Sequence, residues 1–97
     1  EMPSDDRFTA LPGQPNLITA ADAAAIFVQN RSSAAVEVIG TADATPPVDT
    51  SGGILLEGKG VILNEALSDL FPGVPGVVRV WIWPTGDHAV DLKVSYA

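Results

Sequence analysis

The chain has 97 residues, which fits one domain with one hydrophobic core and leaves no room for a second. Hydrophobic residues make up 46% of it and charged residues only 18%, and this low charge indicates that part of the surface meets another protein. Its formal net charge of -7 repels phosphate backbones, cysteine is absent, and no apolar run reaches the ~20 residues of a membrane helix, so we expect neither nucleic-acid nor membrane partners and no disulfides.

Residues 1–22 contain three prolines, a glycine and two adjacent aspartates. Because proline fixes φ and lacks a backbone donor, we predict an extended N-terminal arm here, followed by a folded domain over residues 23–97. The arm either frays, as chain termini often do, or packs on a neighbouring subunit. Its candidate interface residues are the apolar ones, Phe8, Leu11, Leu17 and Ile18.

Short apolar runs separated by turn signals follow the arm. Residues 23–29 and 34–39 predict two strands joined by a polar turn at 30–33. A long loop rich in Thr, Pro and Gly covers residues 40–53. Residues 54–56 and 61–63 predict two more strands around the Gly-rich turn at 57–60. We expect each pair of strands to form a β-hairpin.

One stretch, residues 64–71, has the pattern of a helix. Asn64 is the predicted N-cap, Leu67, Leu70 and Phe71 share one face, and Pro72 ends the segment. We expect one or two helical turns that close one end of a β fold.

The strongest periodicity lies at the end of the chain. In residues 78–83 aliphatic side chains alternate with an arginine and two tryptophans, and residues 90–96 alternate in the same way after a turn at 84–88. Both runs predict strands with one buried face, which we expect to pair as a third hairpin. About six strands with one short helix predict an all-β fold, either a small antiparallel β-sandwich or a jelly-roll-like barrel.

If the aliphatic face of residues 78–83 is buried, then Arg79, Trp81 and Trp83 share the opposite face. Trp and Arg are the residue types most enriched at interface hot spots, and paired tryptophans also form platforms for sugar rings. These side chains can equally face the core or lie under the arm, because a shift of one residue in register exchanges the two faces. The alternation therefore leaves three destinations open for the tryptophans.

The sequence lacks a recognisable catalytic frame. Its single histidine, His88, lies in a polar turn without a Gly-x-Ser-x-Gly motif. The loop aspartates, among them Asp43, Asp49 and Asp87, lie outside the apolar runs that acid catalysis needs, and they form no Asp-x-Asp-x-Asp-Gly loop for calcium, which stays a weaker alternative. The glycines around Lys59 fit a hairpin turn rather than a phosphate loop. We expect no enzymatic activity, no cofactor and no metal.

Two segments carry a resemblance to a known class of protein. The sequence AIFVQNRSSAAVEV at residues 25–38 and GGILLEGKG at 52–60, with DLFPG at 69–73, resembles small virion proteins of tailed bacteriophages. The resemblance covers residues 25–97 and brings no catalytic residues with it. It implies a capsid decoration or stabilisation protein, or a fibre, spike or tail component, of a phage or a phage-derived particle that is assembled in the host cytoplasm.

The expected function is therefore that of a non-enzymatic virion structural protein. Such a protein would form homo-oligomers and dock on a larger shell or tail protein. The alternative is a carbohydrate-binding or adhesive module, which would bind a glycan through the tryptophan face or through the loops at 41–53 and 84–88.

Overall fold

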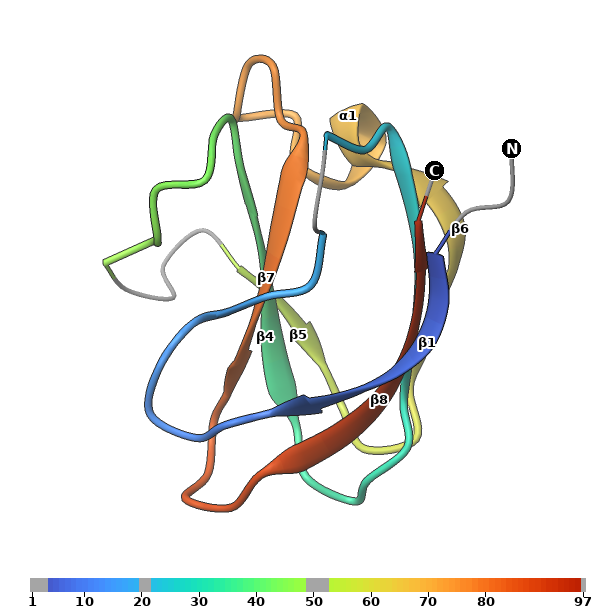
Figure 1. Ribbon diagram of the computed structural model, residues 1–97, viewed down its shortest axis with the longest axis vertical. Coiled ribbons are helices and arrows are strands. Elements are labelled where there is room, and N and C mark those ends of the chain that lie inside the picture. Colours follow the sequence, from blue (N-terminus) through green and yellow to red (C-terminus); the bar gives the residue numbers. More distant parts are fainter. Residues whose placement is uncertain (1–3, 20–21, 49–52, 97) are drawn as a thin grey trace.

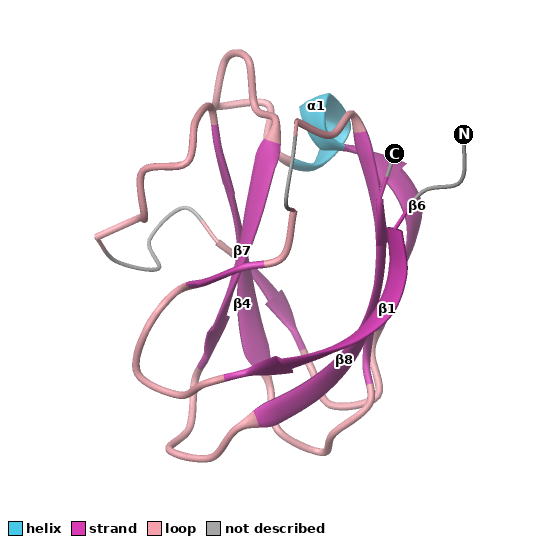
Figure 2. Cartoon of the chain, viewed as in Figure 1, coloured by secondary structure: helices cyan, strands magenta, loops and turns pink. Residues whose placement is uncertain are grey.

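The computed structural model describes residues 4–19, 22–48 and 53–96. Two antiparallel sheets of four strands each face one another (Figure 1 and Figure 2). Sheet A contains, in spatial order, β1 (Ser4–Ala10), β8 (Val90–Tyr96), β3 (Ala25–Asn30) and β6 (Val61–Ala66). Sheet B contains β2 (Asn16–Leu17), β7 (Arg79–Pro84), β4 (Val36–Thr41) and β5 (Ile54–Leu56).

The order of the strands is that of a jelly roll. Along the chain, successive strands pass from one sheet to the other at every step except between β4 and β5, which pair within sheet B. Eight strands arranged in this way over two sheets make a jelly roll, in which the sheets enclose one core. The prediction of a small antiparallel all-β sandwich is confirmed.

All three predicted hairpins are wrong, although their strands are present. In each case the two strands lie in opposite sheets: β3 and β4, β5 and β6, and β7 and β8. The alternation of apolar residues specifies which face of a strand is buried, but it does not specify the neighbouring strand. A turn of a few residues spans the ~10 Å between two packed sheets as well as the ~5 Å between two paired strands.

The predicted buried faces are confirmed, because the inner faces of both sheets are aliphatic. Val80 and Ile82 of β7 are fully buried, while Arg79, Trp81 and Trp83 alternate with them on the outer face of sheet B. Among the described residues, the core cluster contains seventeen side chains, which include Ile26, Val28, Val36, Val38, Val80, Ile82, Val90, Leu92 and Val94. Complete exclusion of these aliphatic groups from water is the main source of stability in such a fold.

The described part of the N-terminal segment is extended, as predicted, but it is built into both sheets instead of forming a separate arm. Strand β1 pairs with β8 over seven residue pairs, from Ser4 opposite Tyr96 to Ala10 opposite Val90. Two residues of β2 then pair with β7. The prolines at 12 and 15 lie in the connection that crosses from sheet A to sheet B, where no ladder needs their N–H groups.

The predicted helix is shorter than expected and begins later. Strand β6 continues to Ala66, so the proposed cap, Asn64, belongs to the strand. Helix α1 (Leu67–Leu70) has Ala66 at its N-cap without a side-chain cap. The buried Leu67 anchors it, and its N–H donates to the carbonyl of Ala24 at 2.8 Å. Within the described ranges, no helix is long and apolar enough to cross a membrane.

Candidate functional site

The outer face of sheet B is the most unusual surface of the molecule. Two rows of side chains cross it, as the register of the strands shows. The first row consists of Leu17, Trp81 and Ile39, and the second of Trp83, Glu37 and Leu55. Five of these six side chains are apolar, on a face that antiparallel sheets usually present to solvent with polar residues.

The first row of this face is covered by the chain itself. Trp81 and Ile39 are each only 5% exposed, although neither belongs to the core cluster between the sheets. The segment that follows β4, drawn in green, runs on the side of sheet B that faces away from sheet A (Figure 1). The second row is more open, since Trp83 is half-buried and Leu55 is 53% exposed.

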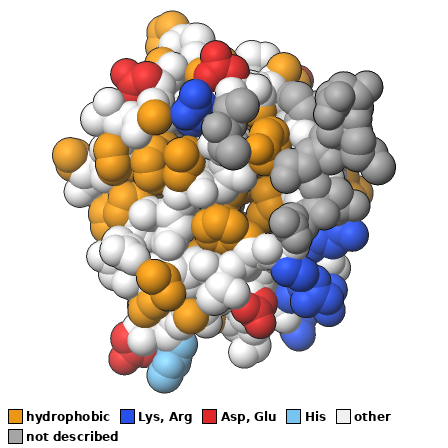
Figure 3. All heavy atoms as spheres, viewed as in Figure 1, with side chains coloured by type: hydrophobic (Ala, Val, Ile, Leu, Met, Phe, Trp, Pro, Cys, Tyr) orange, Lys and Arg blue, Asp and Glu red, His pale blue; other side chains and the backbone are white. Residues whose placement is uncertain are grey.

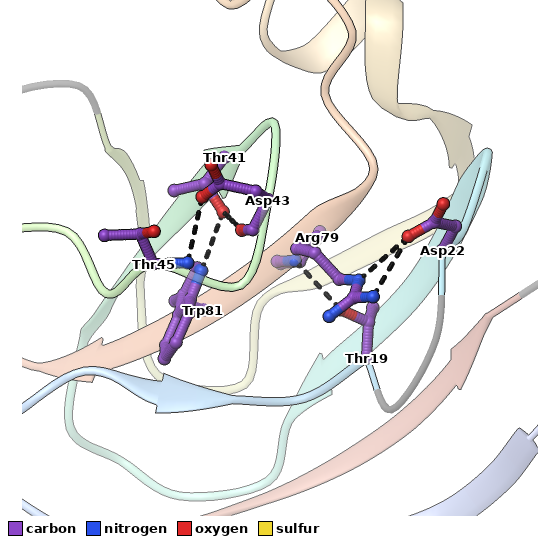
Figure 4. A network of polar contacts seen from close by, with 8 residues as sticks. Thr19, Asp22, Thr41, Asp43, Thr45, Arg79 and Trp81 are labelled. Carbon is purple, nitrogen blue, oxygen red and sulfur yellow. Dashed lines mark hydrogen bonds and ion pairs between the residues drawn. The ribbon is translucent and has the colours of Figure 1, made fainter.

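A chain of hydrogen bonds ties the segment after β4 to the indole of Trp81 (Figure 4). The Nε1–H of Trp81 donates to Thr41 Oγ1 at 2.9 Å, and the Thr41 hydroxyl donates to the carbonyl of Asp43 at 2.6 Å. The N–H of Thr45 donates to Asp43 Oδ1 at 2.9 Å. The backbone N–H and the hydroxyl of Thr45 lower the pKa of Asp43, with a smaller contribution from Arg79. The buried indole therefore has its polar atom satisfied by its own chain.

Arg79 lies at one end of the outer face of sheet B and is held by the segment that precedes β3. Its Nε and Nη2 atoms lie 3.1 and 3.0 Å from Asp22 Oδ1 (Figure 4). Thr19 Oγ1 accepts from the N–H of Val80 at 3.1 Å, inside the fold. These contacts attach residues 19 and 22 to β7, so the guanidinium of Arg79 serves an intramolecular contact.

The other interface residues predicted from sequence do not form one patch. Ile18 is buried in the core, and Phe8 is half-buried against it. Leu11 is 51% exposed, in the connection between β1 and β2. Leu17 does join Trp81, as its direct partner across the strands. The sequence reading missed Ile39 and Leu55, although the alternation within residues 36–39 places Ile39 opposite the buried valines.

A second group of exposed apolar side chains lies on β6. Val61 and Leu63 are 43% and 64% exposed, while Ile62 between them is buried. Strand β6 is an edge of sheet A, and β5 is an edge of sheet B. On the face shown in Figure 3, hydrophobic side chains spread over the left and the centre, whereas the Lys and Arg side chains in view lie mostly at the lower right.

The histidine predicted to lie in a polar turn is at the surface, beside an aspartate. His88 Nε2 lies 3.5 Å from Asp87 Oδ1, and both side chains are more than 90% exposed. Over residues 4–19, 22–48 and 53–96, no three His, Cys, Asp or Glu side chains gather as metal ligands would. A shallow hollow of about 150 Å³ is lined by Gln29, Asn30, Arg31 and Lys59. Of the aspartates considered for calcium, Asp49 lies outside the described residues.

Comparison with known proteins gives no relative for this chain. No family model matches the sequence, no characterised protein matches it significantly, and no solved structure matches its fold significantly.

Proposed function

We propose that this chain is a non-enzymatic virion structural protein of a phage or phage-derived particle, which associates with copies of itself and docks on a larger shell or tail protein. The observation that carries the proposal is the apolar outer face of sheet B. With Val80 and Ile82 on one side and Trp81 and Trp83 on the other, strand β7 is apolar on both faces. A sheet that is apolar on both faces is typical of one covered on both.

The outer face of sheet B has the composition of a docking surface. Trp83 and Leu55 flank Glu37 across three neighbouring strands, and both remain partly accessible. Partly accessible tryptophan and leucine in one row offer the large apolar contact area on which binding hot spots depend. The buried first row supports the second row, because the hydrogen bond from the indole of Trp81 to Thr41 holds the ring in place.

The fold and the sequence resemblance bear on the choice between a virion protein and a glycan-binding module. Jelly rolls recur in viral capsid proteins and in lectins, so the fold is compatible with both candidate functions and decides neither by itself. The resemblance of residues 25–38 and 52–60 to tailed-phage virion proteins favours the particle. A sugar platform of two tryptophans needs both rings at the surface, and Trp81 is 5% exposed, which disfavours the glycan-binding alternative.

The proposal is tested by following the chain into particles. The tagged chain is expressed in the cells that encode it, phage or phage-like particles are purified by density-gradient centrifugation, and the tag is quantified and located by immuno-electron microscopy. We expect the chain to band with the particles in many copies. A chain that stays out of every particle fraction refutes the proposal.

The surface is tested in the same assay. We expect Trp83→Ala combined with Leu55→Ala to reduce incorporation at least about tenfold, since loss of a hot-spot side chain costs ~2 kcal/mol or more. Asp69→Ala changes an exposed residue of α1, which packs against β6 of sheet A, and serves as the control. Incorporation of the double variant at the level of the control would show that docking does not use this face.

A further inference from the structure

Strand β6 is an edge strand whose first half lacks the charged residues that usually protect an edge. Among the four described edges, β2 has two residues and β5 has three. Strand β1 carries three successive charged residues, Asp5, Asp6 and Arg7. Strand β6 has six residues and starts with the uncharged run Val61-Ile62-Leu63. Charged residues and short length are the common means of preventing edge-to-edge pairing, and the first half of β6 lacks both.

The free side of β6 offers backbone groups for a partner strand. The Asn30 N–H donates to the Gly60 carbonyl at 2.9 Å, so the backbone groups of residue 60 point toward β3. In an antiparallel ladder this direction alternates along a strand. The N–H and C=O groups of Ile62, which lies opposite Val28, therefore also point toward β3. The N–H and C=O groups of Val61 and Leu63 point to the free side. In the part of the chain that the structure describes, no strand occupies that side.

The sequence of β6 is complementary to itself in the antiparallel direction. A two-fold axis at Ile62 places Val61 opposite Leu63 of a second copy. This register makes the residues with outward-directed backbone groups the hydrogen-bonded pairs, which gives four N–H···O=C bonds across the axis. Apolar cross-strand pairs on the exposed face add to the pairing.

We propose that β6 pairs antiparallel with β6 of a second copy of this chain, in the register that places Val61 opposite Leu63. The partner is thus a second copy of the chain, and the surface of self-association is the free edge of β6. That this dimer is part of a virion rests on the proposed function. The result is an isologous dimer in which two copies of sheet A form one continuous sheet. Because the two-fold contact uses the same edge in both copies, it is closed and does not propagate into a fibre.

The irregularity in β6 limits the length of this contact. The register with β3 shifts between Ile62 and Glu65, where the pairing passes from Val28 opposite Ile62 to Ile26 opposite Glu65. A bulge of this kind bends the strand and interrupts its regular edge. The ladder between copies is therefore confined to the segment around residues 60–64, which favours one defined register over sliding.

The first test is the mass of the full chain in solution, measured by sedimentation equilibrium over a range of concentrations. We expect a concentration-dependent dimer of twice the 10.0 kDa mass of one chain. Val61→Pro removes an N–H from the free side and none from the ladder with β3, so we expect a folded monomer. Leu63→Lys is also expected to weaken the dimer at least about tenfold, since it places a charge at the centre of the contact. Val48→Lys alters an exposed apolar residue in the loop after β4, which is no part of the β6 edge, and is the control. Circular dichroism verifies that each variant is folded.

A parent chain that remains monomeric at millimolar concentration overturns the inference. A dimer that survives both Val61→Pro and Leu63→Lys, or that Val48→Lys alone disrupts, overturns it too. The particle assay separates this inference from the proposed function: a chain that dimerises through β6 but never enters particles contradicts the function alone, and a monomeric chain found in particles contradicts the dimer alone.

Discussion

Replacing Asn30 should be the most damaging single polar substitution in this fold. Asn30 lies at the end of β3 and is completely buried. Its Nδ2 group donates to the carbonyls of Ala34 at 2.7 Å, Leu56 at 3.3 Å and Glu57 at 3.2 Å. Its Oδ1 accepts from the N–H and the hydroxyl of Ser32, both at 3.0 Å. One amide therefore holds the turn after β3 and the turn between β5 and β6.

The magnitude follows from what Asn30→Ala leaves behind. The variant removes five contacts, and the Leu56 carbonyl loses a buried donor that water cannot easily replace. A buried polar group left without a partner costs about 1–3 kcal/mol, and two or more groups are affected here. We expect a loss of about 3–5 kcal/mol in the free energy of unfolding, which is a large part of the ~5–15 kcal/mol that stabilises a typical domain.

Asn16→Ala is the matched control. Asn16 makes four side-chain contacts of similar length, as a donor to Leu11, Gln14 and Ile82 and as an acceptor from the Leu11 N–H. It is only half-buried, so water can replace most of these bonds, and we expect a loss of about 1 kcal/mol. Urea denaturation followed by tryptophan fluorescence gives both values. Equal costs for Asn30→Ala and Asn16→Ala would refute the reasoning that burial decides the penalty.

Asn30→Asp tests the same site through pH. The introduced carboxyl has nearly the shape of the amide, but in its charged form it cannot donate to the three carbonyls around Nδ2. Burial and these carbonyls raise the pKa of the introduced carboxyl in the folded chain above its unfolded value. Its contribution to stability is therefore fully present below the unfolded pKa and is lost as pH rises through the folded pKa. Relative to the parent chain at each pH, the variant should be more stable near pH 4 than at pH 7, and the opposite order would contradict this assignment.

Three further predictions concern the packing at Gly40, the pairing of β1 and the burial of Trp81. Gly40→Ala would place a methyl group 2.5 Å from a phenylalanine ring and should cost about 1–3 kcal/mol, whereas Gly73→Ala meets nothing within 4 Å and should change the urea midpoint little. Deletion of residues 1–10 removes an edge strand with seven paired residues, so cooperative thermal unfolding in circular dichroism should be lost; an unchanged melting curve would show that β1 is dispensable. Acrylamide should quench Trp83 in Trp81→Phe more strongly than Trp81 in Trp83→Phe, and equal quenching would contradict the burial of Trp81.

The sequence predicted the strands and their buried faces because both depend on local alternation. Residues 78–83 and 90–96 show the principle, since each has a period of two and each buries the predicted aliphatic side. The helix was harder to predict, because Asn64 is a good cap by type but lies in a strand that tertiary pairing with β3 extends to Ala66. Local preference was overridden there by a contact between residues about 40 positions apart.

Strand pairing was predicted incorrectly because it depends on contacts that local patterns do not encode. Residues 30–33 have the composition of a hairpin turn, yet Asn30 turns its side chain inward and bonds to carbonyls 26 and 27 residues away. The N-terminal segment was read as an arm because prolines disfavour central strands. The same prolines are compatible with two edge strands joined by a crossing connection.

The outer face of sheet B was predicted in part. The alternation placed Arg79, Trp81 and Trp83 together, but it left open whether the tryptophans were covered. The indole of Trp81 bonds to Thr41, the last residue of β4 and 40 positions away, and Thr41 bonds in turn to Asp43 in the loop that follows. The free edge of β6 was hidden from the sequence reading, because a hairpin would have paired residues 61–63 with 54–56.

The turn between β5 and β6 explains why a free edge exists at all. If β5 and β6 formed a hairpin, one side of β6 would be covered by β5. Instead residues 57–60 cross between the sheets, packed so closely on the turn after β3 that a Cβ at Gly58 would lie 2.6 Å from the Ser33 backbone. The Lys59 N–H donates to the Ser32 carbonyl at 3.0 Å, and Lys59 adopts a φ of 65°.

This crossing links the stability of the fold to the proposed dimer. Asn30 bonds to both residues that begin the crossing, and its N–H bonds to Gly60 at the start of β6. The buried amide therefore fixes the position from which Val61 and Leu63 present their backbone groups. Asn30→Ala should lower both the free energy of unfolding and the affinity of the dimer, whereas Leu63→Lys should lower the affinity alone. A variant at Asn30 that remains folded in low urea and dimerises like the parent chain would show that the edge of β6 does not depend on this anchor.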